Sequence, residues 1–416
     1  MELRDLESVV RHGLCTGCGI CESMAGRDKV EMRLTAFGQL RPKVKGPLDR
    51  AKLDEVLKVC PGVQVIGPAR FKAGEDGVID PVWGPITSLH RMWAADEAIR
   101  FHAAAGGALT ALGRYLLRSG EVEAILHVKA SRSQPELTDA HVSTTIEDVA
   151  EGAQSRYGPA APLVHVNALL DKGLRFAVIA KPCDIAAIRN LGRIDARVKA
   201  QIPYCLTIFC GGVPTTHTAH KIAAYHGVAP NELGVFRWRG QGWPGPTHIE
   251  TRDGRAYDLS YDTVWYDPNV PWTYDIQFRC KICPDAIGEL ADVACPDGWV
   301  MENGKPIHRE APGVNIAVAR TEVGRRLVER AAAAGEIRLE SFDLPSLHAM
   351  HSDHLERKLG HPARILGLAL AGEPRLRAPG YRAISAVLRA GLAGNWKAFW
   401  GAFRRGRERA NQEPLA

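Results

Sequence analysis

The sequence predicts an α/β protein in three parts: a small cysteine-rich module over residues 1–70, an α/β domain with a mixed or parallel sheet over residues 85–330, and a helical C-terminal extension over residues 331–416. Three observations predict this order. Cysteines crowd the start of the chain, strands and helices alternate from about residue 91, and an apolar helical stripe lies near the end. A chain of 416 residues is long enough for two or three domains, and its 45% hydrophobic and 24% charged residues are ordinary for a soluble globular protein.

The first part is organised around a run of cysteines. Cys15, Cys18 and Cys21 are each separated by two residues, and a fourth cysteine, Cys60, precedes Pro61. Bacterial ferredoxins hold a 4Fe–4S cluster with this spacing, so the sequence predicts a ferredoxin-like module with one such cluster. Zinc is a less favoured alternative, because a zinc site usually uses two separated pairs of ligand residues. A disulfide or inert thiols are less favoured still, because the N-terminus has no signal-peptide pattern and a cytoplasmic location is expected.

Three local patterns fill out this module. Residues 33–42 alternate apolar and polar side chains around a turn at Phe37-Gly38, which predicts a hairpin. Apolar residues at helical spacing over residues 48–59 predict a helix that delivers Cys60. Residues 67–90 are rich in Gly and Pro, which is typical of a linker.

The second part opens with a glycine pair before a helix. Gly106 and Gly107 precede an amphipathic pattern that stops at Gly120. Glycines at the start of a helix leave its first N–H groups open, which suits an anion such as a cofactor pyrophosphate. The same glycines also suit a helix that enters close to a strand, and the pattern alone does not decide between the two interpretations.

Buried strands of the parallel type are predicted at residues 122–130, 174–180 and 202–209. The second strand leads to Cys183 and to a helix over residues 185–191 that Asp184 can cap, and the third ends at Cys210. Sites in open α/β sheets form at the carboxyl ends of strands, so both cysteines are candidate ligands. Cys205 falls inside a strand and is expected to pack as a small apolar side chain.

A second cysteine-rich stretch follows residue 279. It contains Cys280, Cys283 and Cys295, which together with Cys183 and Cys210 give five thiols for a second four-ligand centre, so that one is spare. Before it, residues 236–245 are rich in Gly, Trp and Arg. This stretch is interpreted either as a loop that holds a phosphate and a flat ring or as a packed aromatic turn.

A further strand and helix are predicted over residues 314–334, and the C-terminal part later carries an apolar stripe from Val387 to Phe403. The stripe is expected to pack against the protein itself, and docking of a partner or contact with a membrane surface is the alternative. The net charge of +6 is mild, and part of it lies in a basic tail over residues 404–409. The sequence contains no nucleic-acid motif and no run close to the roughly 18 apolar residues of a membrane span.

Several separated motifs occur in a fixed order along the chain. They are Cys15-x-x-Cys18-Gly19-x-Cys21, Gly106-Gly107-x-x-Thr110, Lys181-Pro182-Cys183-Asp184, Phe209-Cys210-Gly211, Arg239-Gly-x-Gly242-Trp243, and Arg279-Cys280-x-x-Cys283-x-Asp285 with Leu290-Ala-Asp292. This combination resembles the coenzyme F420 hydrogenase/dehydrogenase β-subunit family, which also contains 7-hydroxymethyl chlorophyll a reductase and a ferredoxin-dependent divinyl chlorophyllide reductase. The resemblance covers residues 10–330 approximately.

The resemblance implies an FAD-containing iron–sulfur oxidoreductase, with the α/β domain as its flavin domain. Two 4Fe–4S clusters would feed single electrons to the flavin, which reduces a conjugated ring by hydride transfer. The residues alone suggest the same, because two one-electron centres need a converter such as flavin before they can do hydride chemistry. The expected ligands of the second cluster are Cys183, Cys210, Cys280 and Cys283, with Cys295 as a substitute.

The other expected site residues follow from position in the motifs. Tyr157 is the candidate proton donor or flavin neighbour. The chain departs from the family pattern at Ala105, where a serine is frequent, at Lys181, where a threonine is frequent, and at Cys295, which has no counterpart. The candidate cofactor-binding residues are Gly106, Gly107, Thr110, Arg239, Gly240, Gly242 and Trp243.

The leading hypothesis is a flavin and iron–sulfur reductase. It would take electrons from ferredoxin or another donor subunit and reduce a conjugated small-molecule acceptor, such as the deazaflavin coenzyme F420 or a tetrapyrrole. The alternative is an electron-transfer β subunit of a larger complex, with no substrate of its own, that docks through the C-terminal stripe and basic tail. A scaffold held together by zinc is the interpretation outside redox chemistry, and nucleic acid is not expected as a partner.

Overall fold

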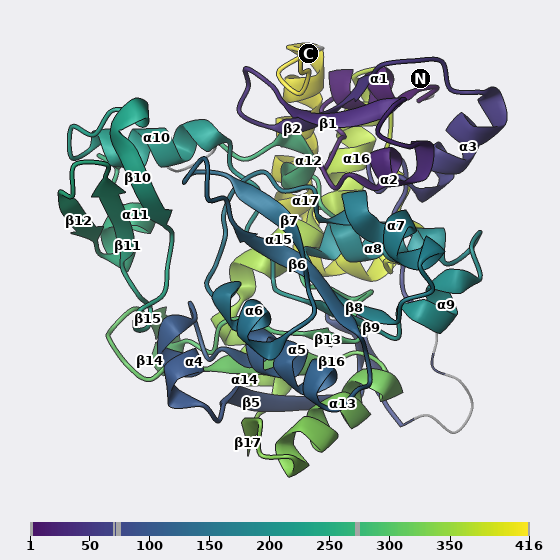
Figure 1. Cartoon of the computed structure of the whole chain (residues 1–416). Helices are drawn as coiled ribbons and strands as arrows, with labels where there is room; N and C mark the ends of the chain where they lie inside the picture. The colour runs from purple at the N-terminus through teal and green to yellow at the C-terminus, as the bar shows by residue number, and fades with distance from the viewer. Residues whose placement is uncertain (1–2, 70, 72–75, 271–274, 415–416) are drawn as a thin grey trace.

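The computed structural model describes residues 3–69, 71, 76–270 and 275–414, and its centre is an eight-stranded sheet (Figure 1). The middle strands β13, β9, β8 and β6 are parallel, and the strands on both sides of them pair antiparallel. The predicted mixed sheet is therefore confirmed. In spatial order the strands are β17 (Ile337–Ser341), β5 (Ser88–Ala94), β16 (Asn315–Ala319), β13 (Val293–Ala294), β9 (Tyr204–Thr207), β8 (Phe176–Ile179), β6 (Ala124–Ala130) and β7 (Thr138–Ser143).

Helices cover both faces of this sheet. Neighbouring residues of a strand point to opposite faces, so the same strand packs against both layers of helices. On one face Ile125 and Leu206 pack against α5, α6 and α13, and on the other Leu126 and Cys205 pack against α7, α8 and α9. The fully buried Cys205 is thus a packing residue inside a strand, as predicted. The helix bounds are α5 (Ala108–Arg118), α6 (Ile146–Glu151), α13 (Glu322–Ala333), α7 (Val166–Asp171), α8 (Pro182–Leu191) and α9 (Arg197–Gln201).

The N-terminal module packs onto the second face through α3, whose Val56 and Val59 share a core with Ile185 of α8. Its predicted hairpin and helix are confirmed, and Asp49 caps α3 by accepting the N–H of Lys52 at 2.7 Å. The module consists of α1 (Leu6–Arg11), α2 (Ile20–Ala25), β1 (Val30–Leu34), β2 (Leu40–Val44) and α3 (Arg50–Val59).

Residues 67–90 are only partly a linker. They contain the hairpin β3 (Val78–Asp80) and β4 (Gly84–Ile86), and they enter the large sheet at Ser88. The linker prediction is therefore wrong for these residues, because Gly and Pro here shape a tight hairpin against the sheet. Residues 70 and 72–75 lie outside the described residues.

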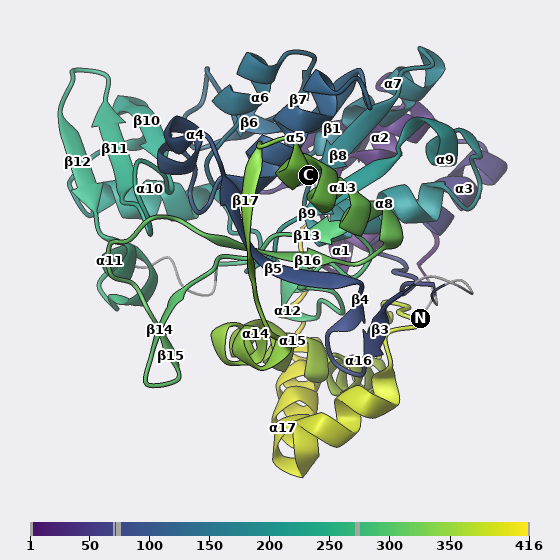
Figure 2. The same cartoon turned by 90° about the horizontal axis from the view of Figure 1, so that it is seen from below.

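A smaller lobe lies to one side of the large sheet in Figures 1 and 2. Its three strands pair antiparallel and bury Phe236, Trp238 and Ile249 against α10 and α11. The stretch expected to be a loop from Phe236 onward starts as the end of strand β10 and becomes irregular only after Arg237. The lobe consists of α10 (Thr216–Ala224), β10 (Leu233–Arg237), β11 (Thr247–Thr251), β12 (Ala256–Leu259) and α11 (Tyr261–Tyr266), and a further hairpin is β14 (Val300–Glu302) with β15 (Lys305–Ile307).

The C-terminal part is helical, as predicted, once the chain has left edge strand β17. After α17 the chain returns to the N-terminal module, where the N–H of Glu413 donates to the carbonyl oxygen of Arg11 at 2.9 Å. None of the described helices has both the length and the apolar character that crossing a membrane requires. The helices are α14 (Leu344–Met350), α15 (Ser352–Leu359), α16 (His361–Leu370) and α17 (Ala383–Arg407).

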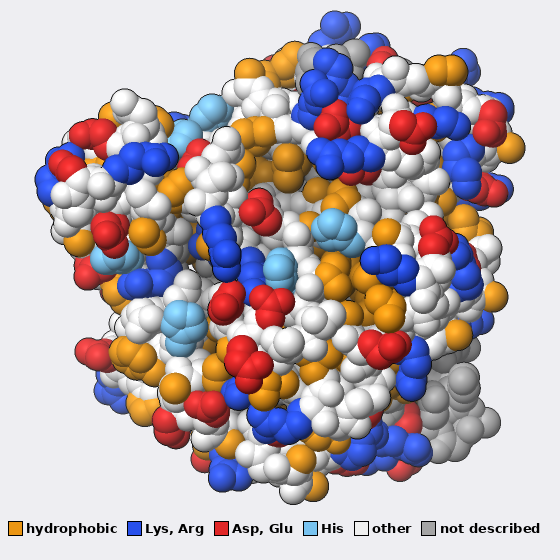
Figure 3. Space-filling model, in the orientation of Figure 1, with side chains coloured by type: hydrophobic (Ala, Val, Ile, Leu, Met, Phe, Trp, Pro, Cys, Tyr) orange, Lys and Arg blue, Asp and Glu red, His pale blue; other side chains and the backbone are white. Residues whose placement is uncertain are grey.

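The apolar stripe of α17 packs against the protein only in part, since Phe399 and Phe403 are half-buried and its other members are exposed, against expectation. Leu388 is 76% exposed, Leu392 is 93% exposed and Trp396 is 64% exposed. The prediction is wrong for these residues because α16 contacts α17 through small residues on its other side, such as Ala402. On the face of the molecule in Figure 3, Lys and Arg side chains are interspersed with Asp and Glu rather than gathered in one area.

Candidate functional site

The four N-terminal cysteines lie together. Cys15 and Cys18 are in the loop before α2, Cys21 is in the first turn of α2, and Cys60 follows the last turn of α3. Burial raises the pKa of each thiol, and the neighbouring thiols raise the pKa of Cys18 and Cys21 further. The loop can take this path because Gly19 adopts φ 84°, and a side chain there would meet Val164 at 2.6 Å.

A second group of four cysteines forms where three segments meet. Cys183 is in the first turn of α8, Cys210 follows β9, Cys280 is in α12 (Phe278–Lys281), and Cys283 lies just after that helix. All four line one small cavity. Burial raises the pKa of Cys183 and Cys210, and nearby thiols raise both further. The structure therefore brings together the four thiols expected for the second centre.

Cys295, the fifth thiol of this stretch, lies elsewhere. Its side chain is buried in the core between the sheet and α5, and burial alone raises its pKa. It does not line the cavity of the second group. The position gives Cys295 a packing role and offers no support for its expected role as a substitute ligand.

Both groups fit a metal centre bound by sulfur. All ten cysteines are in the described part of the chain and all are free thiols. A ligand set made only of thiols suits zinc or an iron–sulfur cluster and not a hard cation. Mutually close, buried thiols with raised pKa values exchange their protons for a metal when they bind one, because the ligating form is the thiolate.

The two groups are neighbours. Thr16, between Cys15 and Cys18 of the first group, lines the cavity of the second. The side-chain amide of Gln277 donates to the carbonyl oxygen of Thr16 at 3.4 Å and to Sγ of Cys280 at 3.5 Å. One residue thus contacts both cysteine-rich segments.

Two buried arginines lie at this junction. Arg41 donates to Gln277 Oε1 at 3.1 Å, and its charge lowers the pKa of Cys15 against the dominant effect of burial. Arg279 donates to the carbonyl oxygen of Pro61 at 3.2 Å and acts in the same direction on Cys60. Arg279 would offset part of the negative charge that two sets of thiolates place in the interior, whereas the charge of Arg41 is shared with the Glu413 carboxylate, 2.6 Å away.

The glycine pair serves close packing. Gly107 caps α5 with φ 70°, and a Cβ on Gly106 would lie 2.8 Å from the backbone nitrogen of Asn315. The first N–H of α5, from Ala108, donates to Asn315 Oδ1 at 3.3 Å, so it already has a partner. Thr110 is half-buried in the next turn. Of the two interpretations of this motif, the structure favours a helix that enters close to a strand.

Arg239 is buried and holds several segments together. Its guanidinium donates to Asp297 at 2.9 Å, to the carbonyl oxygen of Ala104 at 2.7 Å and to the hydroxyl of Tyr157 at 3.3 Å. Its charge is therefore already paired, which disfavours the expected contact with a phosphate. The same bonds bring Tyr157, the Arg239 loop and the segment before Gly106 to one place.

The rest of this loop is packed in a similar way. A Cβ on Gly240 would lie 2.7 Å from the carbonyl oxygen of His102. The N–H of Gly242 donates to the carbonyl oxygen of Phe101 at 2.9 Å. Trp243 is buried and its ring lies 5.1 Å from that of Trp299. Gly240 and Gly242 thus adjoin the end of α4 (Glu97–His102).

A histidine pair links the second cysteine group to this loop. The rings of His351 and His354 lie 5.1 and 5.7 Å from that of Phe209, the residue before Cys210. His351 Nε2 donates to the carbonyl oxygen of Asp297 at 3.0 Å. Burial lowers the pKa of His351 to about 4, so its ring is neutral near pH 7.

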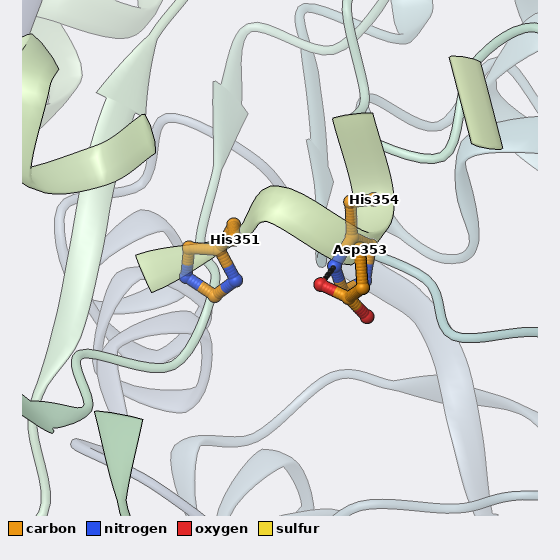
Figure 4. A group of neighbouring side chains, drawn as sticks. All are labelled: His351, Asp353 and His354. Carbon is orange, nitrogen blue, oxygen red and sulfur yellow. Dashed lines mark hydrogen bonds and ion pairs between the residues drawn. The ribbon is translucent and has the colours of Figure 1, made fainter. Parts of the chain in front are cut away.

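His351, Asp353 and His354 offer ligand atoms within 4.8 Å of one another (Figure 4). His354 Nδ1 already bonds Asp353 at 2.9 Å, and His351 Nε2 is held by Asp297. We therefore assign this group to packing around Phe209. Sequence reasoning missed it, although two histidines three residues apart at a helix start were a signal for it.

A large basic groove lies beside the first cysteine group. It has a volume of about 1140 Å³ and is lined by residues next to Cys60, among them Leu57, Lys58 and Val63. Five cations line the groove. Among the described residues only one of them, Arg50, forms an ion pair, with Asp54 at 2.9 Å. Cys60 is also the least buried thiol of the first group. The five cations are Arg4, Arg50, Lys58, Arg375 and Arg377.

The fold and the two thiol groups define a mixed α/β protein built around cysteine-rich centres. Family comparison matches residues 89–167 to the N-terminal part, and residues 173–344 to the C terminus, of the coenzyme F420 hydrogenase/dehydrogenase beta subunit. The chain therefore belongs to this family of oxidoreductase subunits, and the resemblance is confirmed. The second cysteine group falls within the matched residues and the first group precedes them.

Individual relatives agree with this assignment. The F420-dependent formate dehydrogenase subunit beta of Methanocaldococcus jannaschii is 28% identical over 251 residues, which are 59% of this chain and 60% of that protein. A subunit of the F(420)H(2) dehydrogenase of Methanosarcina mazei is 20% identical over 77% of this chain and 83% of its own. A chain of the F420-reducing NiFe hydrogenase complex from Methanosarcina barkeri has the same fold, with a TM-score of 0.55 and 18% identity. The match covers 72% of this chain and 98% of that chain. The match thus spans less than two thirds of the length of the formate dehydrogenase subunit.

Proposed function

We propose that this protein is an electron-transfer oxidoreductase subunit with two 4Fe–4S clusters and FAD, which passes electrons between a donor protein and a conjugated ring acceptor. The observation that carries the proposal is the convergence of eight thiols into two neighbouring groups of four. Each group supplies the ligand number of a 4Fe–4S cluster. The proposed ligands are Cys15, Cys18, Cys21 and Cys60 for one cluster and Cys183, Cys210, Cys280 and Cys283 for the other.

We place the flavin site where the segment before α5, Tyr157 and the Arg239 loop meet. Nε1 of Trp238 and of Trp243 are buried there without a hydrogen-bond partner among the described residues, as expected beside a missing polar group. Bound FAD would supply the exchange between one-electron and hydride chemistry. Gly106, Gly107 and Thr110 remain proposed flavin neighbours, and Arg239 would position the site rather than bind phosphate.

The acceptor we propose is the deazaflavin coenzyme F420, because the relatives are named as F420-dependent enzymes. Protein purified without oxygen should contain about eight iron and eight sulfide per chain and should release FAD on denaturation. It should then reduce F420, or oxidise its reduced form, in an anaerobic absorbance assay. Zinc without sulfide would refute the proposed clusters. Iron with no flavin would refute the proposed role of FAD in exchanging single electrons for hydride.

An electron-transfer β subunit without a substrate of its own is the second candidate. It is favoured by the relatives, which are named as subunits of dehydrogenases and match this chain over part of their length. Purification from the native host would then yield a stable complex, and the isolated chain would carry its clusters but reduce no acceptor.

The basic groove beside Cys60 is the proposed docking site of the electron donor. An acidic carrier such as a ferredoxin would complement its unpaired cations and place its own cluster next to the least buried thiol of the first group. We expect Arg375→Glu/Arg377→Glu to lower the second-order rate of reduction by ferredoxin about tenfold or more, and the wild-type rate to fall with added salt. Stopped-flow absorbance measures both rates.

Arg132→Glu is the matched control, because Arg132 is 95% exposed in the connection between β6 and β7, beside Glu151, and does not line the groove. Reduction by dithionite should be unchanged in all variants, which shows that the clusters are intact. A ferredoxin rate that ignores both salt and the paired substitution would place the donor elsewhere.

A further inference from the structure

The buried residues of α17 are small, whereas most of its large apolar residues are exposed and Phe399 and Phe403 are half-buried. Ala402 and Gly406 are buried against the protein. A Cβ on Gly367 of α16 would lie 2.4 Å from the carbonyl oxygen of Phe399, so the two helices meet backbone to backbone. This contact needs only the small residues. The bulky side chains on the opposite side are not explained by packing within the chain.

These bulky side chains lie on both segments of α17, before and after Gly391, and we call them together the outer face of α17. Within each segment they are spaced four residues apart, the spacing that places side chains along one side of a helix. Figure 2 shows α17 at the margin of the molecule, beyond α16. The outer face consists of Ile384, Leu388, Leu392, Trp396 and Trp400, which are 80%, 76%, 93%, 64% and 50% exposed.

A bend divides α17 into two segments. Gly391 breaks the helix with φ 65° and ψ 176°, and the side-chain amide of Asn395 donates to the carbonyl oxygens of Val387 and Gly391, each at 2.7 Å. Leu392, the most exposed apolar residue of the outer face, follows this bend directly. Two carbonyl oxygens beside the break are thus satisfied, which supports the bend as a built feature of the helix.

The charges of α17 all have one sign. Between Ala383 and Arg407 the sequence holds five cations and no Asp or Glu. Every one of them is exposed, and their nearest acidic partner among the described residues is Glu408, 3.9 Å from Arg404. The five cations are Arg389, Lys397, Arg404, Arg405 and Arg407.

We propose that the outer face of α17 binds the surface of an anionic membrane, with its apolar side chains in the headgroup boundary and the cations of the helix on the lipid phosphates. A cationic helix with exposed Leu and Trp is the pattern of an interfacial helix. The rings of Trp396 and Trp400 stack at 5.8 Å, and indoles favour this boundary because one edge is polar. Since no described helix can cross a membrane, α17 lies on the surface.

Charge also argues against a second copy of the chain as the occupant. In a two-fold contact the same surface meets itself, so five cations would face five cations. Anionic lipid neutralises them instead. The proposal does not depend on the clusters or on the flavin, so it stands or falls separately from the proposed function.

The test is flotation of the full-length protein with vesicles. We expect binding to vesicles of phosphatidylcholine mixed with phosphatidylglycerol, and at least tenfold weaker binding to phosphatidylcholine alone. Leu388→Ser/Leu392→Ser and Arg389→Gln/Lys397→Gln should each reduce binding to anionic vesicles about tenfold or more. Val323→Ser, which removes a 45% exposed apolar side chain from α13, should leave it unchanged.

Unchanged thermal unfolding of each variant shows that binding was lost without loss of the fold. The proposal is overturned by no flotation of the wild type with anionic vesicles, by equal loss in the Val323→Ser control, or by self-association that the α17 substitutions abolish while vesicle binding is absent. A stable complex in which an acidic protein subunit covers α17 and blocks vesicle binding would equally overturn it.

Discussion

Replacing Cys183 with alanine is expected to remove the second cluster, so that the iron content of anaerobically purified protein falls from about eight to about four atoms per chain. Cys183 lines the same cavity as Cys210, Cys280 and Cys283, and a cluster with three ligands in this set is easily lost. The first group is untouched by the change. Iron and acid-labile sulfide analysis, with absorbance near 400 nm, measures the loss.

Cys295→Ala is the matched control, since it removes another buried thiol from the same region of the sequence. Cys295 packs in the core between the sheet and α5, so this variant should keep about eight irons and lose about 1 kcal/mol of stability at most. If Cys295→Ala loses four irons and Cys183→Ala keeps eight, the ligand assignment is reversed.

Glu289→Gln is expected to have the largest effect on stability. The Glu289 carboxylate is fully buried and pairs with Lys358 of α15 and with Arg382, the residue before α17. Burial lowers the pKa of Lys358 against the pull of this carboxylate. Loss of one partner of a buried ion pair leaves uncompensated charge, which costs about 3–5 kcal/mol. The midpoint of urea unfolding, followed by tryptophan fluorescence, measures the change.

The change should also reach the second cysteine group. Asp285, which lines its cavity, accepts the backbone N–H of Glu289 at 2.9 Å and the hydroxyl of Tyr381 at 3.1 Å. Glu340→Gln is the control, because Glu340 is 60% exposed and its pairing with Arg91 at 3.6 Å contributes less than about 1 kcal/mol. Addition of Lys358→Met to Glu289→Gln should restore part of the loss. A neutral result for Glu289→Gln would show that the network carries no net stability.

The cysteine groups could be predicted from the sequence because their signals are local. Cys15, Cys18 and Cys21 are fixed by a short spacing, and strand ends place Cys183 and Cys210 at one edge of the sheet. Strands β6, β8, β9 and β16 were found from their apolar runs, β5, β7, β13 and β17 were not predicted, and the mixed sheet is confirmed. These features need no knowledge of which distant segments meet.

The features that failed depend on contacts across the chain. The sequence does not show that Asn315 lies beside Gly106, so it leaves two interpretations of the glycine pair open. It also does not show that Asp297 pairs with Arg239, so the arginine was expected to be available for a phosphate. The stripe of α17 was expected to be buried because large apolar residues usually are. Instead, α16 packs against α17 where the residues are small. Arg41 gave no local signal, since its role at the junction comes from hairpin β1–β2 folding over Gln277.

The two ends of the chain meet at the N-terminal module. The backbone oxygen of Asn411 would lie 2.1 Å from a Cβ on Gly13, and the carboxylate of Glu413 pairs with the buried Arg41 at 2.6 Å. Arg41 and Glu413 are 372 residues apart in the sequence. The packing of the N-terminal module is therefore complete only when a very distant segment has joined it, and such long-range closure slows folding.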